Sequence, residues 1–158
     1  MALGFGMRRG GTGEPVDFVG ETRWRYRPIV IQGSLAEVQA ALDAAAKIEE
    51  DLKERNVQFV VALPSADQVK LQKTFDCVWF ASSADKITAI YLRNDDGKKP
   101  HQWALVGYDG SVKAAGSLPI DFAKEIMAKI DTMPMRKDEM ADKKFKPTAE
   151  CILGKEIG

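Results

Sequence analysis

Apolar residues follow two patterns along the chain, short continuous runs and helical repeats. The run at 28–32 is apolar and β-branched, which predicts a buried strand. From Ser34 to Leu52, apolar side chains return every three or four positions, which predicts one long helix with an apolar face. A second apolar run at 57–63 predicts another strand. A strand, a long helix and a strand form a βαβ unit, so the two strands are expected to be parallel.

Local signals mark both ends of the long helix. Ser34 and Glu37 have the spacing of a capping box, in which the hydroxyl accepts from the Glu37 amide and the carboxylate accepts from the Ser34 amide. Asn56 suits the left-handed conformation that ends many helices. The helix is therefore expected between Ser34 and Asn56.

The region 65–100 has weaker patterning. Residues 66–75 and 85–93 favour helices and residues 77–80 favour a short strand, although the second helical segment is also rich in β-prone side chains. Asn94–Gly97 has the composition of a turn. The expected order is helix, strand, helix and turn.

Residues 103–113 predict a hairpin. Its two-residue turn is Asp109-Gly110, a pair suited to a turn in which both positions have positive φ. From Pro119, apolar residues return every four positions, which predicts a closing helix. That helix is expected to end before Pro134, because the residue preceding a proline avoids helical geometry.

The closing helix leads into the sequence Met133-Pro134-Met135-Arg136. Both methionines are expected to pack against the core as the helix ends. Arg136 is expected to bind a carboxylate inside the protein. A short helix is expected around residues 137–143.

Two segments resemble a known family. Ala104–Lys113 and Ile130–Met140, the latter with Met-Pro-Met-Arg and a following Glu-Met, are similar to a thioredoxin-like family of unknown function. That family includes small bacterial proteins and the C-terminal domains of sushi-repeat extracellular-matrix proteins. The resemblance covers residues 22–140 and implies an α/β thioredoxin-like fold, a mixed sheet flanked by helices, with a loosely implied role in interaction or assembly. It implies no catalytic residues, and Tyr108 stands where the family has lysine.

Outside this region the chain is expected to form extended arms. Residues 1–21 are rich in glycine and arginine and lack periodicity, and residues 141–158 are mixed in charge. The expected division is an N-terminal arm (1–21), a thioredoxin-like domain (22–140) and a C-terminal arm (141–158). Aromatic and basic side chains in and beside the N-terminal arm are natural anchors on a partner protein. The candidate partner-binding residues are Phe5, Arg8, Arg9, Phe18, Arg23, Trp24 and Tyr26.

The sequence lacks the paired cysteines of a thioredoxin-type reaction centre. Such enzymes carry Cys-x-x-Cys after the first strand, at a helix start whose dipole lowers the thiol pKa, and Gly33–Ala36 occupies that place here. Ser34 is expected to cap the helix rather than act as a nucleophile. Cys77 and Cys151 are expected to be free thiols, with Cys77 buried, although a bridge between them is an alternative.

Other motifs are too incomplete to predict a site. His101 is the single histidine and is expected in a solvated loop, and the turn at 94–97 lacks the rest of a calcium loop. Gly10–Gly13 lacks the lysine of a phosphate loop. Pro100 lies near the place of this fold's cis-proline but is expected to be an ordinary loop proline. No metal and no cofactor are therefore expected.

Composition narrows the function classes. The 23 basic residues balance 23 acidic ones, which argues against nucleic acid as the main partner, since phosphate binding relies on clustered cations. No apolar stretch approaches the roughly 20 residues that span a bilayer. The charges of the first residues follow the apolar part, which is the reverse of a secretory signal.

The expected function is a non-catalytic interaction module, an accessory subunit or assembly factor of a larger protein complex. A membrane-associated organellar complex is one candidate, and an organellar or periplasm-like compartment is favoured. The alternative is a thiol oxidoreductase or peroxidase that uses Cys77 alone. A third interpretation is a small-ligand binder with a pocket beside Trp79 and Trp103.

Overall fold

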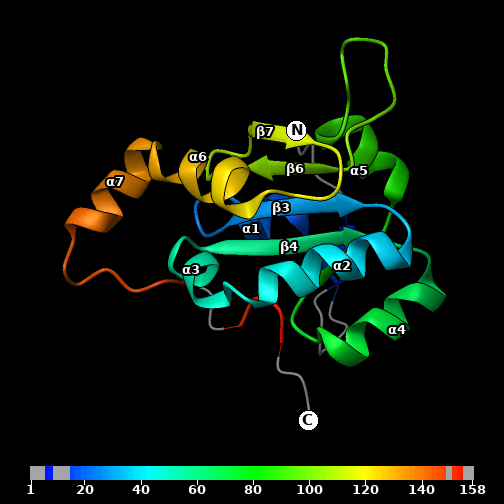
Figure 1. Cartoon of the computed structure of the whole chain (residues 1–158), viewed down its shortest axis with the longest axis horizontal. Helices are drawn as coiled ribbons and strands as arrows, with labels where there is room; N and C mark the ends of the chain where they lie inside the picture. Colours follow the sequence, from blue (N-terminus) through cyan, green and yellow to red (C-terminus); the bar gives the residue numbers. More distant parts are fainter. Residues whose placement is uncertain (1–5, 9–14, 149–150, 155–158) are drawn as a thin grey trace.

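A mixed sheet forms the centre of the protein (Figure 1). The computed structural model describes residues 6–8, 15–148 and 151–154. In this part of the chain the sheet has seven strands in the order β2-β1-β5-β4-β3-β6-β7. The strands are β1 (Gly6–Arg8), β2 (Pro15–Asp17), β3 (Arg27–Gln32), β4 (Val57–Ala62), β5 (Trp79–Ala81), β6 (Trp103–Val106) and β7 (Val112–Gly116).

Helices cover both faces of the sheet. In the described residues they are α1 (Phe18–Thr22), α2 (Leu35–Ala46), α3 (Glu49–Glu54), α4 (Ser65–Thr74), α5 (Ala84–Tyr91), the π-helix η1 (Phe122–Met127), α6 (Ala128–Asp131) and α7 (Pro134–Ala141). Figure 1 shows α2, α3, η1 and α6 in front of the sheet and α1 behind it. Phe59 of β4 meets Phe122 of η1 edge to face, and Phe18 of α1 meets Tyr91 of α5. These ring pairs join each helical layer to the apolar core.

The predicted βαβ unit is confirmed. β3 and β4 are parallel, with Ile29 opposite Phe59. The single helix expected between them is in fact two, because Ile48 has φ −130° and ψ 31° and so leaves helical geometry between α2 and α3. Asn56 ends this region in the left-handed conformation, with φ 55°, as its residue type predicts.

The weakly patterned region folds as expected, with α4, β5 and α5 in sequence. β5 pairs with β4 in parallel, and Ser83 caps α5 by accepting from the Lys86 amide. The loop between α5 and β6 projects from the body of the protein (Figure 1). This helix–strand–helix segment places Cys77 just before β5.

The hairpin and the closing helices also form, with β6 and β7 antiparallel. The expected two-residue turn with positive φ at both positions is wrong, because residues 107–111 join the strands and Gly110 alone among them has positive φ, 85°. The closing helix ends before Pro134, which then begins α7 at its first turn. In the described ranges the cis peptide bond is Leu118–Pro119, whereas Pro100 is an ordinary loop proline.

Both terminal segments pack on the domain where the structure describes them. β1 pairs with β5 and with β2, so the N-terminal residues extend the sheet. Ile152 and Leu153 are fully buried in the core. Among the described residues, no helix combines the length and apolar character needed to cross a membrane.

Candidate functional site

The start of α2, where thioredoxin-type enzymes carry paired cysteines, holds a capping box. Ser34 Oγ accepts from the Glu37 amide (3.1 Å), and Glu37 Oε1 accepts from the Ser34 amide (3.0 Å). Gln102 Nε2 donates to the other carboxylate oxygen (3.2 Å). These bonds, that of the Ser34 backbone above all, lower the pKa of Glu37. The expected capping role of Ser34 is confirmed, and its hydroxyl is engaged in structure.

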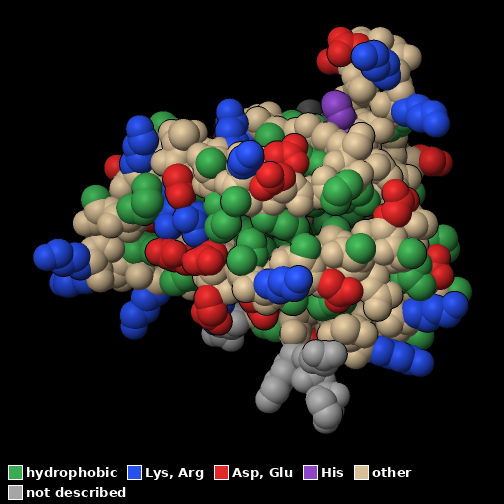
Figure 2. Space-filling view, in the orientation of Figure 1, with side chains coloured by type: hydrophobic (Ala, Val, Ile, Leu, Met, Phe, Trp, Pro, Cys, Tyr) green, Lys and Arg blue, Asp and Glu red, His purple; other side chains and the backbone are tan. Residues whose placement is uncertain are grey.

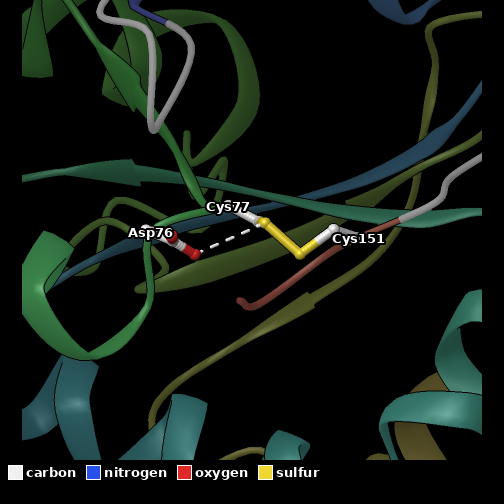
Figure 3. A group of neighbouring side chains, drawn as sticks. All are labelled: Asp76, Cys77 and Cys151. Atoms are coloured by element: carbon white, nitrogen blue, oxygen red, sulfur yellow. Dashed lines mark hydrogen bonds between the residues drawn. A yellow bond between two sulfur atoms is a disulfide. The ribbon is translucent and has the colours of Figure 1, made fainter. Parts of the chain in front are cut away.

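The structure joins Cys77 and Cys151 in a disulfide, with their Cα atoms 6.0 Å apart (Figure 3). The expectation of two free thiols is therefore wrong. The reason lies in tertiary structure, because the chain returns after α7 and brings Cys151 to the turn before β5. An oxidoreductase that uses Cys77 alone would first require this bond to be opened.

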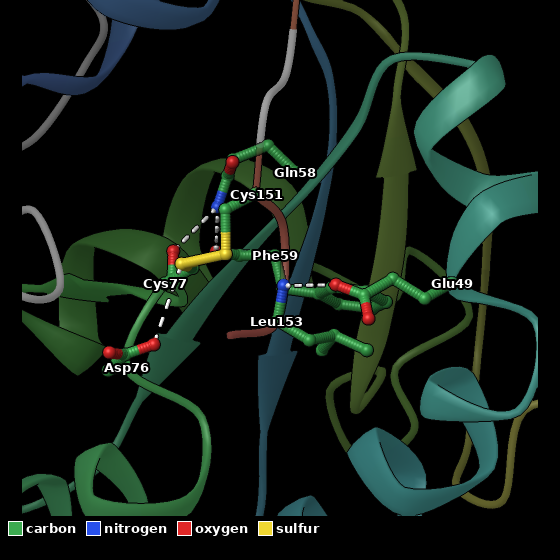
Figure 4. The surroundings of a disulfide bond; sticks show 7 residues. All are labelled: Glu49, Gln58, Phe59, Asp76, Cys77, Cys151 and Leu153. Atoms are coloured by element: carbon green, nitrogen blue, oxygen red, sulfur yellow. Dashed lines mark hydrogen bonds between the residues drawn. A yellow bond between two sulfur atoms is a disulfide. The ribbon is translucent and has the colours of Figure 1, made fainter. Parts of the chain in front are cut away.

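Residues 151–154 form what we term the C-terminal strap, which closes over the core beside the disulfide (Figure 4). The Cys77 amide donates to the Leu153 carbonyl (3.1 Å), and the Leu153 amide donates to Glu49 Oε2 (3.4 Å). Gly154 has φ 109°, and a Cβ atom there would lie 2.6 Å from the backbone nitrogen of Asp76. Only glycine therefore allows the strap to approach this turn so closely.

Asp76 completes a cluster with the two cysteines. Its Oδ1 atom lies 3.5 Å from Cys77 Sγ (Figure 3). The ligand atoms of Asp76, Cys77 and Cys151 all lie within 4.8 Å of one another. Within the described ranges, this is the group of His, Cys, Asp and Glu side chains close enough to share a metal ion, and His101 lies outside it.

A second candidate site surrounds Trp24, between α1 and β3. Trp24 has φ 66°, a left-handed conformation that is rare for a bulky side chain, and the side chain is 61% exposed. Its amide donates to the Tyr108 carbonyl (2.9 Å), which fixes this turn against the β6–β7 hairpin. Unusual backbone conformations gather at functional sites. The turn thus holds a large aromatic ring in solvent.

Trp24 borders a surface pocket of about 320 Å³ whose wall includes Met133, Pro134 and Met135. Met135 is 45% exposed, so the prediction that both methionines pack against the core is wrong for this residue. Pro134 begins a new helix there, and Met135 in its first turn is left partly in solvent. We refer to Trp24, Met133, Pro134 and Met135 as the Trp24 surface.

Charged residues form the rim of the Trp24 surface. Lys113 Nζ lies 3.2 Å from Asp109 Oδ2. Hydrogen bonds from Ser111, first from its backbone, lower the pKa of Asp109 to about 2. The exposed Arg23 guanidinium lies over Gly110, and the described part of the chain offers it no carboxylate partner. The rim therefore has one unpaired cation beside a neutral ion pair.

Buried charges lie behind the pocket. Arg27 and Arg136 are 1% and 2% exposed. Arg27 donates to both carboxylate oxygens of Glu139 (3.1 and 3.3 Å), and Arg136 donates to Glu139 (3.4 Å) and to Asp131 (3.3 Å). The expected internal carboxylate partner of Arg136 is thus confirmed. Figure 2 shows acidic and basic side chains side by side between α3 and α7.

Tyr108 and Arg55 complete this buried ion cluster. The Tyr108 hydroxyl donates to Glu139 Oε2 (2.5 Å), and burial followed by this bond raises the pKa of Tyr108 to about 12. The Arg27 guanidinium stacks on the Tyr108 ring, 4.0 Å from its centroid. Arg55 binds both oxygens of Asp131 and lowers its pKa. The cluster fixes the start of α7, and with it Met135.

The predicted partner-binding residues separate into three groups. Arg23 and Trp24 are exposed, as a docking role requires. Phe18 and Tyr26 are 1% and 8% exposed, which corrects their assignment, because their rings pack on Tyr91 and Trp79 in the core. The backbone of Arg8 lies in β1, and Phe5 and Arg9 lie outside the described residues.

Three functional features were not predicted from the sequence. Asp76 lies beside the disulfide, and no motif in the neighbouring sequence marks it. The exposure of Met135 follows from the turn at Pro134, which the sequence does contain. Glu139 lies three residues after Arg136, a spacing that brings two side chains together on a helix. That spacing could have predicted their ion pair from the sequence.

Solved structures of low sequence identity share this fold. The reduced 2-Cys peroxiredoxin of Plasmodium vivax is 14% identical, with a TM-score of 0.60 over 85% of this chain and 93% of that one. The exposed lipoprotein thioredoxin Etrx1 of Streptococcus pneumoniae is 14% identical, with a TM-score of 0.57 over 82% and 99%. Mycobacterium tuberculosis AhpC is 11% identical, with a TM-score of 0.55 over 87% and 90%. The fold is therefore α/β and thioredoxin-like, as predicted.

Sequence comparison adds one match. Residues 18–139 match the family described as "Domain of unknown function (DUF4174)". None of the curated proteins matches the chain. The matched region runs from Phe18 in α1 to Glu139 in the buried ion cluster, and it includes the whole Trp24 surface.

Proposed function

The chain belongs to the DUF4174 family, and from that premise we propose that it is a non-catalytic interaction module, an accessory subunit or assembly factor of a larger protein complex. Its cysteines are joined to each other, and the place of a thioredoxin-type reaction centre is a helix cap. Both features favour binding over redox catalysis. The partner is expected to be a protein complex of an organelle or of the cell envelope. Membrane-associated complexes are among the candidates.

The observation that carries this proposal is the exposed, left-handed Trp24 beside Met135. An exposed tryptophan contributes little to folding, yet the Tyr108 carbonyl holds its backbone in a rare conformation. Tryptophan, methionine and arginine are enriched at protein interfaces, and tryptophan and arginine dominate their binding energy. The Trp24 surface supplies tryptophan and methionine around one pocket, and Arg23 lies on its rim.

The chemistry of the rim indicates the kind of partner. Asp109 and Lys113 neutralise each other, whereas Arg23, next to Trp24, has no carboxylate partner in the part of the chain that the structure describes. A partner segment with an apolar side chain beside a carboxylate would fill the pocket and pair with Arg23. Such a charge-assisted bond fixes orientation as well as adding affinity.

The disulfide supports an oxidising location. Disulfides persist in secreted, periplasmic and similar compartments and are rare where thiols are kept reduced. This agrees with the organellar or periplasm-like compartment that we propose. The similarity to domains of sushi-repeat extracellular-matrix proteins stays a prediction. Those domains would then share the oxidising environment proposed for this chain.

The experiment compares tagged full-length variants expressed in the native cell. Trp24→Asn removes the ring while placing there a residue that tolerates positive φ, so folding is preserved. Val69→Asn on α4 is the matched control, since Val69 is 56% exposed and α4 lies on the opposite side of the molecule from α7, which carries Met135 (Figure 1). Size-exclusion chromatography with mass spectrometry of the co-eluting proteins measures how much of each variant is in a complex.

We expect wild-type and Val69→Asn chains in the same high-mass fraction. Trp24→Asn should elute mainly as the free chain, because loss of a central aromatic anchor weakens binding at least about 10-fold. Arg23→Gln should also weaken the association. Lowering the salt concentration should strengthen the association of this variant less than that of the wild type. Unchanged co-elution of Trp24→Asn would contradict the proposal, and so would an equal loss in Val69→Asn.

A further inference from the structure

We propose that Asp76, Cys77 and Cys151 form a redox-controlled metal site, a disulfide when oxidised and a Zn²⁺ site when reduced. This inference concerns none of the residues of the Trp24 surface and does not depend on the proposed function. Two thiolates and one carboxylate are among the ligands that zinc uses in proteins. Three protein ligands leave a fourth position for water.

The arrangement of the side chains suits a tetrahedral ion. With Zn–S near 2.3 Å and Zn–O near 2.1 Å, a sulfur and an oxygen ligand lie about 3.6 Å apart. Asp76 Oδ1 and Cys77 Sγ are already 3.5 Å apart (Figure 3). The third ligand, Cys151, is exposed, so rotation of its side chain can bring its sulfur to the remaining vertex.

The backbone around Cys77 is held firmly, as a metal site requires. The Cys77 amide donates to the Leu153 carbonyl, and the Cys77 carbonyl accepts from Gln58 Nε2 (3.3 Å). Gln58 is 2% exposed and lies on β4 (Figure 4). The site is therefore built on a central strand, with its open side toward solvent at Asp76 and Cys151.

The change of state balances with a dithiol as reductant. A thiolate of the dithiol attacks the Cys77–Cys151 bond, and its second thiol completes the exchange. Two electrons pass to the cysteine sulfurs, and the dithiol becomes a disulfide. The two cysteine thiols then lose their protons as Zn²⁺ binds.

Asp76 gives the reduced state a third ligand beside the two cysteines. A bound Zn²⁺ would hold the Asp76 carboxylate and both sulfurs together. The metal would then take over the covalent bond's role and keep Ile152 and Leu153 in the core.

The test uses the full-length chain, reduced anaerobically with a phosphine and freed of metal. Co²⁺ serves as a spectroscopic probe of thiolate ligation, and Zn²⁺ affinity is measured by competition with a chromophoric chelator. We expect one ion per reduced chain, a thiolate-to-Co²⁺ charge-transfer band, and no binding to the oxidised chain. Asp76→Asn should bind at least 10-fold more weakly, and Asp95→Asn, in another exposed turn, should bind normally.

A second measurement follows the strap. Hydrogen exchange of residues 151–154 should be slow in the oxidised chain and in the reduced chain with Zn²⁺, and fast in the reduced chain with a chelator. Asp76→Asn that binds Zn²⁺ as tightly as wild type would overturn the proposal. So would a reduced wild-type chain that binds no more tightly than Cys77→Ser, and neither result would affect the Trp24 proposal.

Discussion

Glu139 is the carboxylate on which the buried ion cluster depends, and Glu139→Gln tests that role. Its oxygens accept from Arg27, Arg136 and Tyr108. Arg136 keeps Asp131 and Glu54 as acidic partners after the change. Among the described residues, Arg27, which is 1% exposed, keeps the Arg55 carbonyl and the Tyr108 ring but no carboxylate. The substitution therefore leaves one buried cation without a counter-charge.

The expected cost follows from distance and burial. Unit charges about 4 Å apart interact by about 4 kcal/mol at the effective dielectric of such sites. Breaking a buried pair by removing one partner costs about 3–5 kcal/mol. Glutamine still accepts from Tyr108, and Glu139 is 10% exposed, so we expect about 3 kcal/mol. For a chain of this length, that lowers Tm by about 6–12 °C.

Urea and thermal unfolding of the oxidised chain, followed by circular dichroism, measure this loss. Glu54→Gln is the matched control, because Glu54 also pairs with Arg136 (3.3 Å) but its side chain is 56% exposed. We expect that variant to lose less than about 1 kcal/mol. Adding Arg27→Met to Glu139→Gln should restore stability, since the unpaired charge is removed. Equal losses for the two glutamine variants would refute the reasoning.

Three further predictions concern the strap and the titrating groups. Gly154→Ala should speed reduction of the disulfide by a dithiol, because its Cβ would strike Asp76; an unchanged rate would count against this close approach. The pKa of Tyr108 is raised to about 12, so its ionisation should lower the free energy of unfolding only as pH rises from about 10 toward 12. The difference in 295 nm absorbance between wild type and Tyr108→Phe should titrate near 12 rather than near 10. Asp131, with its pKa lowered by Arg55, stabilises the fold above about pH 4 and loses that contribution as pH falls further. The stability gap between wild type and Asp131→Asn should therefore narrow on acidification, and a constant gap would contradict the assignment.

Much of the fold could be predicted because its signals are local. The capping box at Ser34, the left-handed Asn56 and the Asp-Gly turn each act within a few residues. The break at Ile48 could not be predicted, since the apolar face continues through it from α2 into α3. At this point the packing of the two helices on the sheet, and not the repeat of apolar residues, determines where the helix breaks.

The candidate sites depend on contacts between distant residues, so the sequence revealed them only in part. Arg27 and Glu139 lie 112 positions apart, and Cys77 and Cys151 lie 74 apart. Nothing near either cysteine indicates that the chain returns there. Trp24 was predicted as an anchor from its residue type alone, whereas the observation that supports it is its backbone conformation.

The N-terminal hairpin has a consequence for the design of truncations. β1 covers β5 through Met7 opposite Ala81 and Arg8 opposite Phe80. Deleting residues 1–17 would leave the apolar strand β5 with unsatisfied amides and carbonyls, which invites a second molecule to add its own strand. A shortened chain that failed to join its complex would then have failed because it associates with itself, and not because a binding segment was removed. Substitutions in the intact chain separate these two outcomes.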